Sequence, residues 1–114
     1  MSKTLFERIA AKEIPAQIVF EDEHIVAFRD IQPVAPTHVL VVPRRPIARL
    51  EDATPADRAA LGHLLLKVPE IAARLGLKEN GYRLVLNNGP DAGQEVPHLH
   101  FHLLGGRRLT WPPG

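Results

Sequence analysis

A run of alternating histidines near the C-terminal end is the feature of this sequence that could do chemistry. His98, His100 and His102 are separated by single apolar residues. Side chains on a β-strand point alternately to opposite faces, so a strand over residues 97–104 would place the three imidazoles in one row. An imidazole can act as a nucleophile or exchange protons near neutral pH. The pattern therefore predicts a catalytic row of histidines on a strand whose other face is apolar.

Metal binding is the main alternative for histidines at this spacing. Alternate residues on a strand lie roughly 6.6 to 7 Å apart, whereas zinc–nitrogen bonds are only about 2 Å long. One ion could bridge two neighbouring imidazoles, but a straight strand cannot bring all three onto one ion. The sequence also has no cysteine and no His-Glu-x-x-His segment. We therefore expect neither a metal nor another cofactor.

Composition limits the other function classes. The formal charge is +1 and no basic run exceeds two residues, which argues against broad nucleic-acid binding but leaves single nucleotides open. The N-terminal residues lack the apolar core of a signal peptide, and no apolar run approaches the roughly 20 residues of a membrane span. The absence of cysteine fits a reducing compartment. We expect one cytoplasmic domain over residues 1–114, with residues 107–114 as a tail and no membrane partner.

The rest of the chain must position the histidines, and its patterns predict a mixed α and β fold. A short helix starting at Thr4 is interpreted as a plain packing helix. A longer helix runs from Thr54 to Gly76, and Pro69 should kink or split it. His63 on that helix is interpreted as a surface residue. Four strands besides the histidine strand are expected, over residues 17–21, 24–30, 37–43 and 82–87.

Polar groups outside the histidine row could join the same site. Asp30 closes a strand, where it is either a turn former or an acceptor for two ribose hydroxyls. His38 stands at the start of another strand, where loops often deliver functional groups. The loop over residues 88–95 is rich in glycine and amides, and is either an ordinary connection or a source of N–H donors for an anion. Trp111, the only tryptophan, should cover an apolar surface, which could belong to another subunit.

These residues together resemble a known family. Residues 98–104 fit the His-x-His-x-His-x-x signature, with apolar x, of the histidine-triad (HIT) superfamily. Similarity to its Hint branch, the histidine-triad nucleotide-binding proteins, extends in the same order through Ile14-Pro15-Ala16, Phe20-Glu21-Asp22, Ala27-Phe28-Arg29-Asp30-Ile31, Ala35-Pro36-Thr37-His38, Leu75-Gly76-Leu77, Gly81-Tyr82-Arg83, Gly93-Gln94, Leu104-Gly105-Gly106-Arg107 and Trp111-Pro112-Pro113-Gly114. The resemblance implies an α+β fold with a five-stranded antiparallel sheet and two main helices. It also implies a homodimer whose sheets join.

The resemblance further implies an activity and a set of roles. Hint proteins hydrolyse purine nucleoside phosphoramidates, such as adenosine 5′-phosphoramidate, through a nucleotidyl-histidine intermediate, and release AMP and an amine. His100 is then the expected nucleophile, His102 contacts the phosphate and assists the leaving group, and His98 and His38 are supporting histidines. The expected substrate contacts are Phe20, Phe28 and Ile31 at the base, Asp30 at the ribose, Asn87, Gly93, Gln94 and Glu95 at sugar and phosphate, and Trp111 in the tail.

Some positions depart from the family pattern. Glu95 stands where many relatives have Ser or Thr, and an ionised carboxylate cannot donate to a phosphate and would oppose its charge. Pro97 stands where many have an aromatic residue, and Arg29 stands where His is frequent, which could change the purine preference. Two other functions stay open: a dinucleoside polyphosphate hydrolase of the related Fhit branch, and a nucleotide-binding regulatory protein with little turnover.

Overall fold

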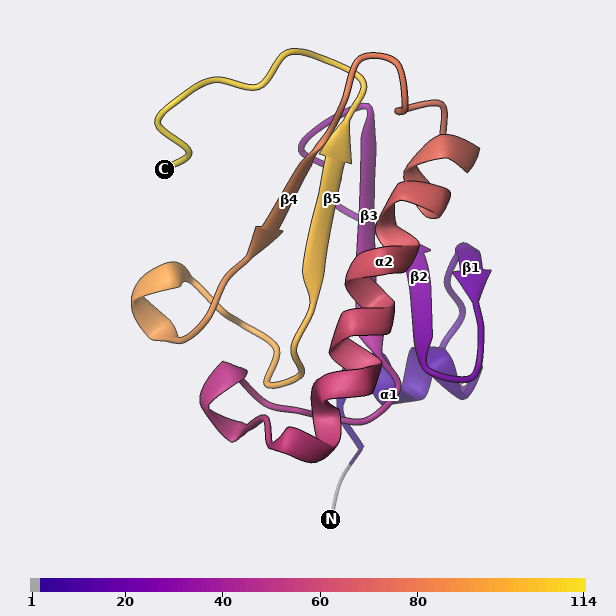
Figure 1. The fold of residues 1–114 in the computed structure, drawn as a ribbon, viewed down its shortest axis with the longest axis vertical. Helices are drawn as coiled ribbons and strands as arrows, with labels where there is room; N and C mark the ends of the chain where they lie inside the picture. Colours follow the sequence, from indigo (N-terminus) through magenta and orange to yellow (C-terminus); the bar gives the residue numbers. More distant parts are fainter. Residues whose placement is uncertain (1–2) are drawn as a thin grey trace.

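The computed structural model describes residues 3–114 as one sheet with a helix on each face (Figure 1). The expected α+β class and the five antiparallel strands are confirmed, but α2 is the only long helix in the described part of the chain, because α1 has six residues. Three short 3-10 turns connect these elements. In chain order the elements are α1 (Leu5–Ala10), β1 (Ile18–Glu21), β2 (Ile25–Arg29), β3 (Thr37–Pro43), turns Leu50–Asp52 and Pro55–Asp57, α2 (Arg58–Arg74), β4 (Arg83–Leu86), turn Pro90–Ala92 and β5 (Phe101–Gly105).

The histidine strand lies in the interior of the sheet. The strand order is β1-β2-β3-β5-β4, with every neighbouring pair antiparallel. Within β5, His102 lies opposite Leu40 of β3 on one side and Val85 of β4 on the other. Because both neighbours hydrogen-bond to it, β5 has a fixed register, and a slip of one residue would move His102 to the other face.

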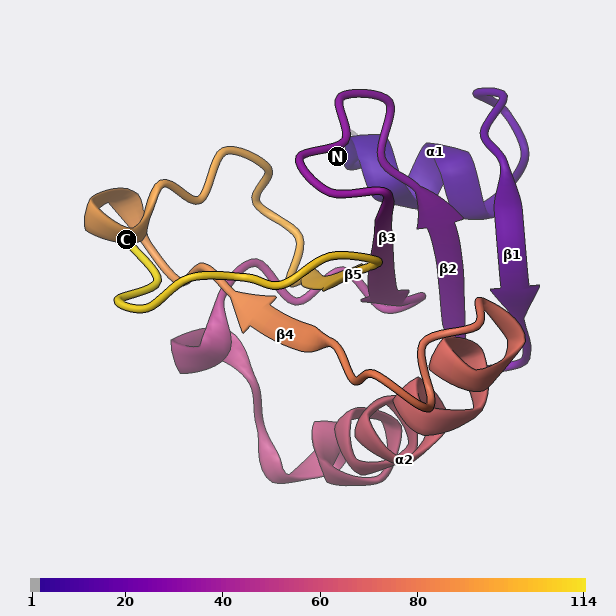
Figure 2. The same ribbon diagram turned by 90° about the horizontal axis from the view of Figure 1, so that it is seen from above.

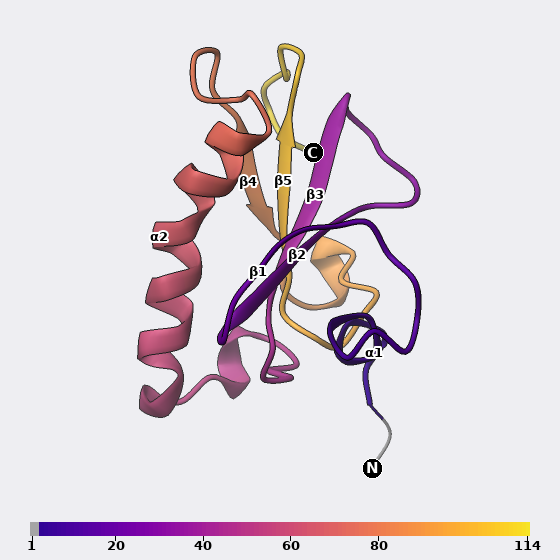
Figure 3. The same ribbon diagram turned by 90° about the vertical axis from the view of Figure 1, so that its right-hand side faces the viewer.

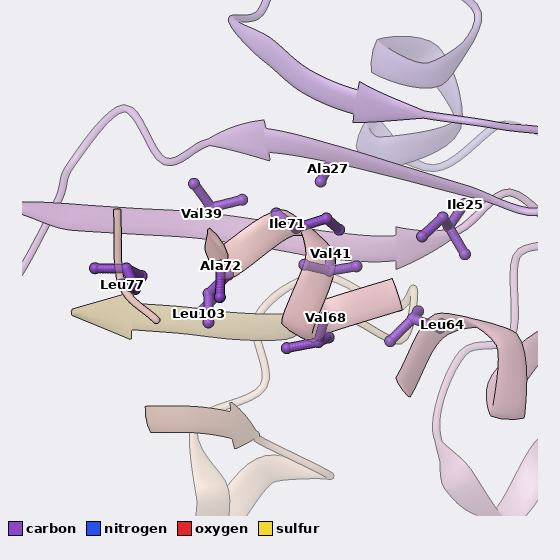
Figure 4. Packing of buried hydrophobic residues seen from close by; sticks show 10 residues of the cluster. All are labelled: Ile25, Ala27, Val39, Val41, Leu64, Val68, Ile71, Ala72, Leu77 and Leu103. Atoms are coloured by element: carbon purple, nitrogen blue, oxygen red, sulfur yellow. The ribbon is translucent and has the colours of Figure 1, made fainter. Parts of the chain in front are cut away.

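The two faces of the sheet bury separate hydrophobic clusters. Figures 2 and 3 show α2 covering one face and α1 lying beside the other. Alternate residues of β2 and β3 point to opposite faces, so both strands are buried along nearly their whole length. The cluster under α2 (Figure 4) contains Ile25, Ala27, Val39, Val41, Leu64, Val68, Ile71, Ala72, Leu77 and Leu103, and the cluster beside α1 contains Phe6, Ile9, Val26, Phe28, Leu40 and Val42.

Two expectations concern helix α2. Pro69 does not split it, since the helix is continuous on both sides of an exposed proline ring, and the buried Val68 and Ile71 hold it on the sheet. His63 is half-buried, and its Nε2 lies 2.6 Å from Asp22 Oδ2 in the turn between β1 and β2, so it fixes the helix to that turn. Within residues 3–114 no helix is both long and apolar enough to cross a membrane.

Candidate active site

The alternating histidines face the α1 side of the sheet, although the strand begins later than predicted. Backbone N–H groups of His98 and Leu99 donate to Val96 and Ile47 carbonyls, so regular pairing starts only at Phe101. The alternation nevertheless persists, because the rings of His98 and His100 pack against Phe6 of α1 at 5.7 and 4.9 Å between centroids. The predicted row of imidazoles on one face is therefore present, with only one of them inside the strand proper.

A cavity of about 490 Å³ lies over this face, between α1, the sheet and the loop before β5. Eight of the expected site residues line it: Phe28, Asp30, Ile31, Asn87, Gly93, Glu95, His100 and His102. The wall formed by α1 and the turn after it was not predicted, and it contributes Leu5, Phe6, Ile9, Ile14, Pro15 and Ala16. The one sequence feature that could have indicated this wall is the segment Ile14-Pro15-Ala16, which resembles the family pattern. The sequence of α1 by itself has the pattern of an ordinary packing helix.

His100 presents a nitrogen lone pair to the cavity. Its Nδ1 lies 2.7 Å from the carbonyl oxygen of His98, and a carbonyl oxygen only accepts. The hydrogen of a neutral His100 ring is therefore on Nδ1, and Nε2 carries the lone pair. The ring is only 7% exposed and lines the cavity, so its orientation is set by packing as well as by this hydrogen bond. His100 thus has the tautomer that a nucleophilic imidazole requires.

His102 presents the opposite group, an N–H donor. The N–H of Val34 donates to His38 Nδ1 at 3.1 Å, which places the hydrogen of a neutral His38 on Nε2. That N–H donates to His102 Nδ1 at 2.9 Å, so His102 carries its own hydrogen on Nε2. Burial, followed by the nearby His100 and His38, lowers the pKa of His102 to about 4. Burial also lowers the pKa of His38, against the attraction of Asp30. Both rings are therefore neutral at pH 7.

Asp30, His38 and His102 together form the one cluster within residues 3–114 that could hold a metal ion, with one ligand atom from each inside 4.8 Å. The hydrogen bonds argue against that role. A metal on His38 Nε2 would require the hydrogen to move to Nδ1, where it would face the N–H of Val34. The donor set therefore suits a chain of hydrogen-bonded neutral rings better than a metal site.

His98 supports the site from beneath and does not line the cavity. Its ring is fully buried, with Nε2 2.7 Å from the Pro43 carbonyl and Nδ1 2.6 Å from the hydroxyl of Thr4. Burial is the largest cause holding its pKa below the usual value. His98 therefore links the end of β3 and the start of α1 to the loop that carries His100.

Asp30 and Gln94 show how the loops at the cavity are held. Asp30 Oδ1 accepts the backbone N–H of Gln32 at 2.8 Å, as a turn former does, while Oδ2 lies 3.4 Å from His38 Nε2 and the residue lines the cavity. Gln94 does not line the cavity. Its side-chain oxygen accepts from Gly89 N–H, and its nitrogen donates to the carbonyls of Ala48 and Val96. Gln94 therefore shapes the loop.

Phe20 and Trp111 lie outside the cavity. The register between β1 and β2 shifts by one residue between Ile18 and Phe20, so Ile18 packs beside α1 and Phe20 packs against the cluster under α2. The guanidinium of Arg74 lies 5.2 Å from the centre of the Phe20 ring. Because of this bulge, the expected base contact at Phe20 is not part of the cavity. Trp111 is 80% exposed in the tail and is not among the residues lining the cavity of its own chain.

Comparison with known proteins agrees with this arrangement. Residues 11–109 match the HIT domain family. An uncharacterized HIT-like protein of Synechococcus elongatus is 60% identical over 111 residues, which cover 97% of this chain and 96% of the relative. Similar solved structures include a HIT family hydrolase from Legionella pneumophila, with 52% identity, a TM-score of 0.94, and coverage of 98% of this chain and 100% of that chain. A histidine triad nucleotide-binding protein from Candida albicans has 33% identity, a TM-score of 0.83, and coverage of 98% and 85%. The chain therefore belongs to the HIT domain family.

Proposed function

We propose that this protein hydrolyses purine nucleoside phosphoramidates, releasing a nucleoside monophosphate such as AMP and an amine. The observation that carries the proposal is the pairing of opposite tautomers in one cavity. His100 offers a lone pair on Nε2, and His102 offers a hydrogen on Nε2. Their rings lie 5.1 Å apart between centroids, which suits attack on a phosphorus whose oxygen accepts a hydrogen bond from the neighbouring ring.

The rest of the cavity fits the other parts of a nucleotide. Phe28 and the apolar side chains of α1 form a wall suited to a flat base, and Ile31, which is 93% exposed, stands at the mouth of the cavity. The carboxylate of Asp30 can accept the hydroxyls of a ribose. Gly93, whose φ of +81° lies in the left-handed region, turns the loop so that it runs past the cavity.

The reaction divides into two displacements at the same phosphorus. His100 Nε2 forms a bond to the α-phosphorus while the bond from phosphorus to nitrogen breaks and the amine leaves. Water then attacks the phosphorus and gives up a proton to solvent, the bond from phosphorus to His100 Nε2 breaks with its electron pair returning to that nitrogen, and the nucleotide is released. His102 is neutral in the free protein, so it donates a hydrogen bond to the phosphoryl group and the departing nitrogen takes its proton from solvent.

Intact-protein mass spectrometry after brief mixing with adenosine 5′-phosphoramidate tests this function. The wild type should carry a transient added AMP and accumulate free AMP, and His100→Ala should do neither while still binding AMP. His24→Ala is the matched control, because His24 is an exposed histidine at the turn between β1 and β2. Absence of both adduct and AMP from the wild type would overturn the proposal. Cleavage of a dinucleoside polyphosphate in that case would favour the polyphosphate hydrolase, and binding without turnover would favour a regulatory protein.

A homodimer is part of the same proposal. Strand β4 is an edge of the sheet, and Tyr82 just before it is 40% exposed. Leu66 on α2 is 81% exposed and Trp111 in the tail is 80% exposed, so large apolar groups are available for a second copy of the chain. Sedimentation should show a dimer at micromolar concentration that Trp111→Ala weakens, and a monomeric wild type would refute this part. The cytoplasmic location stays a prediction from composition.

A further inference from the structure

The hydroxyl of Thr4 makes two contacts that belong to different parts of the fold. Thr4 caps α1, because its Oγ1 accepts the N–H of Glu7 at 3.0 Å while the Glu7 carboxylate accepts the N–H of Thr4 at 2.9 Å. The same Oγ1 lies 2.6 Å from Nδ1 of His98, which is 94 residues away in the sequence. A capping residue does not need this second contact.

The direction of the second hydrogen bond follows from the other partner of His98. Nε2 of His98 lies 2.7 Å from the carbonyl oxygen of Pro43, which only accepts, so a neutral His98 carries its hydrogen on Nε2. Nδ1 then has a lone pair, and the hydroxyl of Thr4 must donate to it. The single hydroxyl hydrogen of Thr4 therefore satisfies a fully buried nitrogen that would otherwise have no partner.

His98 passes this constraint to His100 through the backbone. The carbonyl oxygen of His98 accepts Nδ1–H of His100 at 2.7 Å, and that hydrogen bond leaves Nε2 of His100 free to attack. A rotation of the His98 ring or peptide would therefore misplace the nucleophile. Phe6, two residues after Thr4, packs edge-on against both rings, so the start of α1 touches this pair from two directions.

We propose that Thr4 is a positioning residue for the reaction, holding His98 neutral and oriented so that the His98 carbonyl fixes the tautomer of His100. The proposal rests on the proposed function, because His100 is taken as the nucleophile. Thr4 itself does not line the cavity, so it acts only through His98.

Three substitutions separate the capping role from the donor role. Thr4→Ser keeps the acceptor for Glu7 N–H and the donor to His98. Thr4→Asp keeps the capping acceptor, but its carboxylate cannot donate to Nδ1 and instead attracts a second proton to His98. Thr4→Val loses both roles. Circular dichroism and thermal unfolding should show that Thr4→Asp folds as the wild type does, which makes it the informative variant.

The first readout is the ring ¹⁵N spectrum of His98 in the absence of substrate. The wild type and Thr4→Ser should show a neutral ring with hydrogen on Nε2, and Thr4→Asp should show a doubly protonated ring at pH 7. The second readout is steady-state hydrolysis of adenosine 5′-phosphoramidate. Thr4→Asp should lower kcat by about tenfold with KM nearly unchanged, because a positive charge on His98 opposes the positive charge that develops on the His100 ring as its Nε2 bonds to phosphorus. Thr4→Ser, which retains the hydroxyl donor to His98, should keep the kcat of the wild type.

The outcomes distinguish the two proposals. An unchanged His98 ring or an unchanged kcat in folded Thr4→Asp would mean that Thr4 is only a helix cap, and would overturn the positioning role. If the wild type releases no AMP, the proposed function fails by itself. The ring spectrum of His98 would then still decide whether Thr4 controls its protonation.

Discussion

Acidification should destabilise this protein through His102. The pKa of His102 is about 4 in the folded chain, against an ordinary value of 6.5, because the ring is buried and lies beside His100 and His38. Between these two values the unfolded chain binds the proton and the folded chain does not. The free energy of unfolding therefore falls as the pH is lowered through this window. The stability that depends on a neutral His102 ring is fully present only above about pH 6.5.

The size of the effect follows from the same two pKa values. At pH 5 the unfolded ring is almost wholly protonated and the folded ring is almost wholly neutral, so linkage assigns His102 a loss of about 2 kcal/mol relative to pH 7.5. Burial lowers the pKa of His38 and His98 as well, so the loss for the whole protein should be larger. The contribution of His102 must therefore be isolated as a difference between variants.

Urea unfolding of the wild type and His102→Asn at pH 7.5 and pH 5.0 provides that difference. Asparagine keeps a donor and an acceptor but does not titrate, so the variant should lose about 2 kcal/mol less than the wild type on acidification. His24→Asn, which removes an exposed histidine, is the control and should follow the wild type. Equal losses in the wild type and His102→Asn, or an NMR titration of His102 near 6.5, would refute the reasoning.

Three further predictions follow from the cavity. Bound AMP should raise the pKa of His102, because phosphate charge favours the imidazolium, and an NMR titration with and without AMP would show the shift or refute it. Glu95→Gln should lower KM for phosphoramidates about threefold at low salt and less at high salt, since it removes a negative charge that lines the cavity. An unchanged KM at low salt would mean that the carboxylate lies too far from the phosphate to repel it. Phe28→Ala should raise KM by about tenfold or more, whereas Phe20→Ala should lower stability and leave KM unchanged, because the two rings lie on opposite faces of the sheet. Steady-state kinetics and thermal unfolding of both variants would check this contrast, and equal effects on KM would contradict it.

Local pattern was sufficient to predict which elements form and which face of the sheet carries the site. The period of two over residues 98–104 predicted the imidazoles on one face, and the structure keeps that alternation although only His102 lies within β5 and His98 and His100 precede it. The same rule failed at Phe20. Ile18 and Phe20 have the spacing of residues on one face, but an additional residue in β1 turns them to opposite faces. A bulge arises from pairing with β2, so the sequence of β1 alone contains no sign of it.

The role of α1 could not be predicted for a different reason. Thr4 and Glu7 satisfy each other as a capping box, which already accounts for both residue types, so nothing local points to a third partner. The contact with His98 depends on two segments at opposite ends of the chain meeting over one face of the sheet. Likewise, the strand pattern that located Asp30 and His38 did not indicate that Asp30 would face the His38 ring while also closing its own turn.

The tautomers of the histidines are fixed by backbone groups, which have no protonation state to change. The N–H of Val34 can only donate to His38, and the carbonyl oxygen of His98 can only accept from His100. Each ring therefore has its reactive nitrogen chosen by the fold before any ligand arrives, with a lone pair on His100 and a hydrogen on His102. In solution two neutral imidazoles could exchange these two forms, and here they cannot. In the proposed reaction this difference gives identical side chains separate tasks, so the loops that contribute these backbone groups matter to that reaction as much as the histidines do.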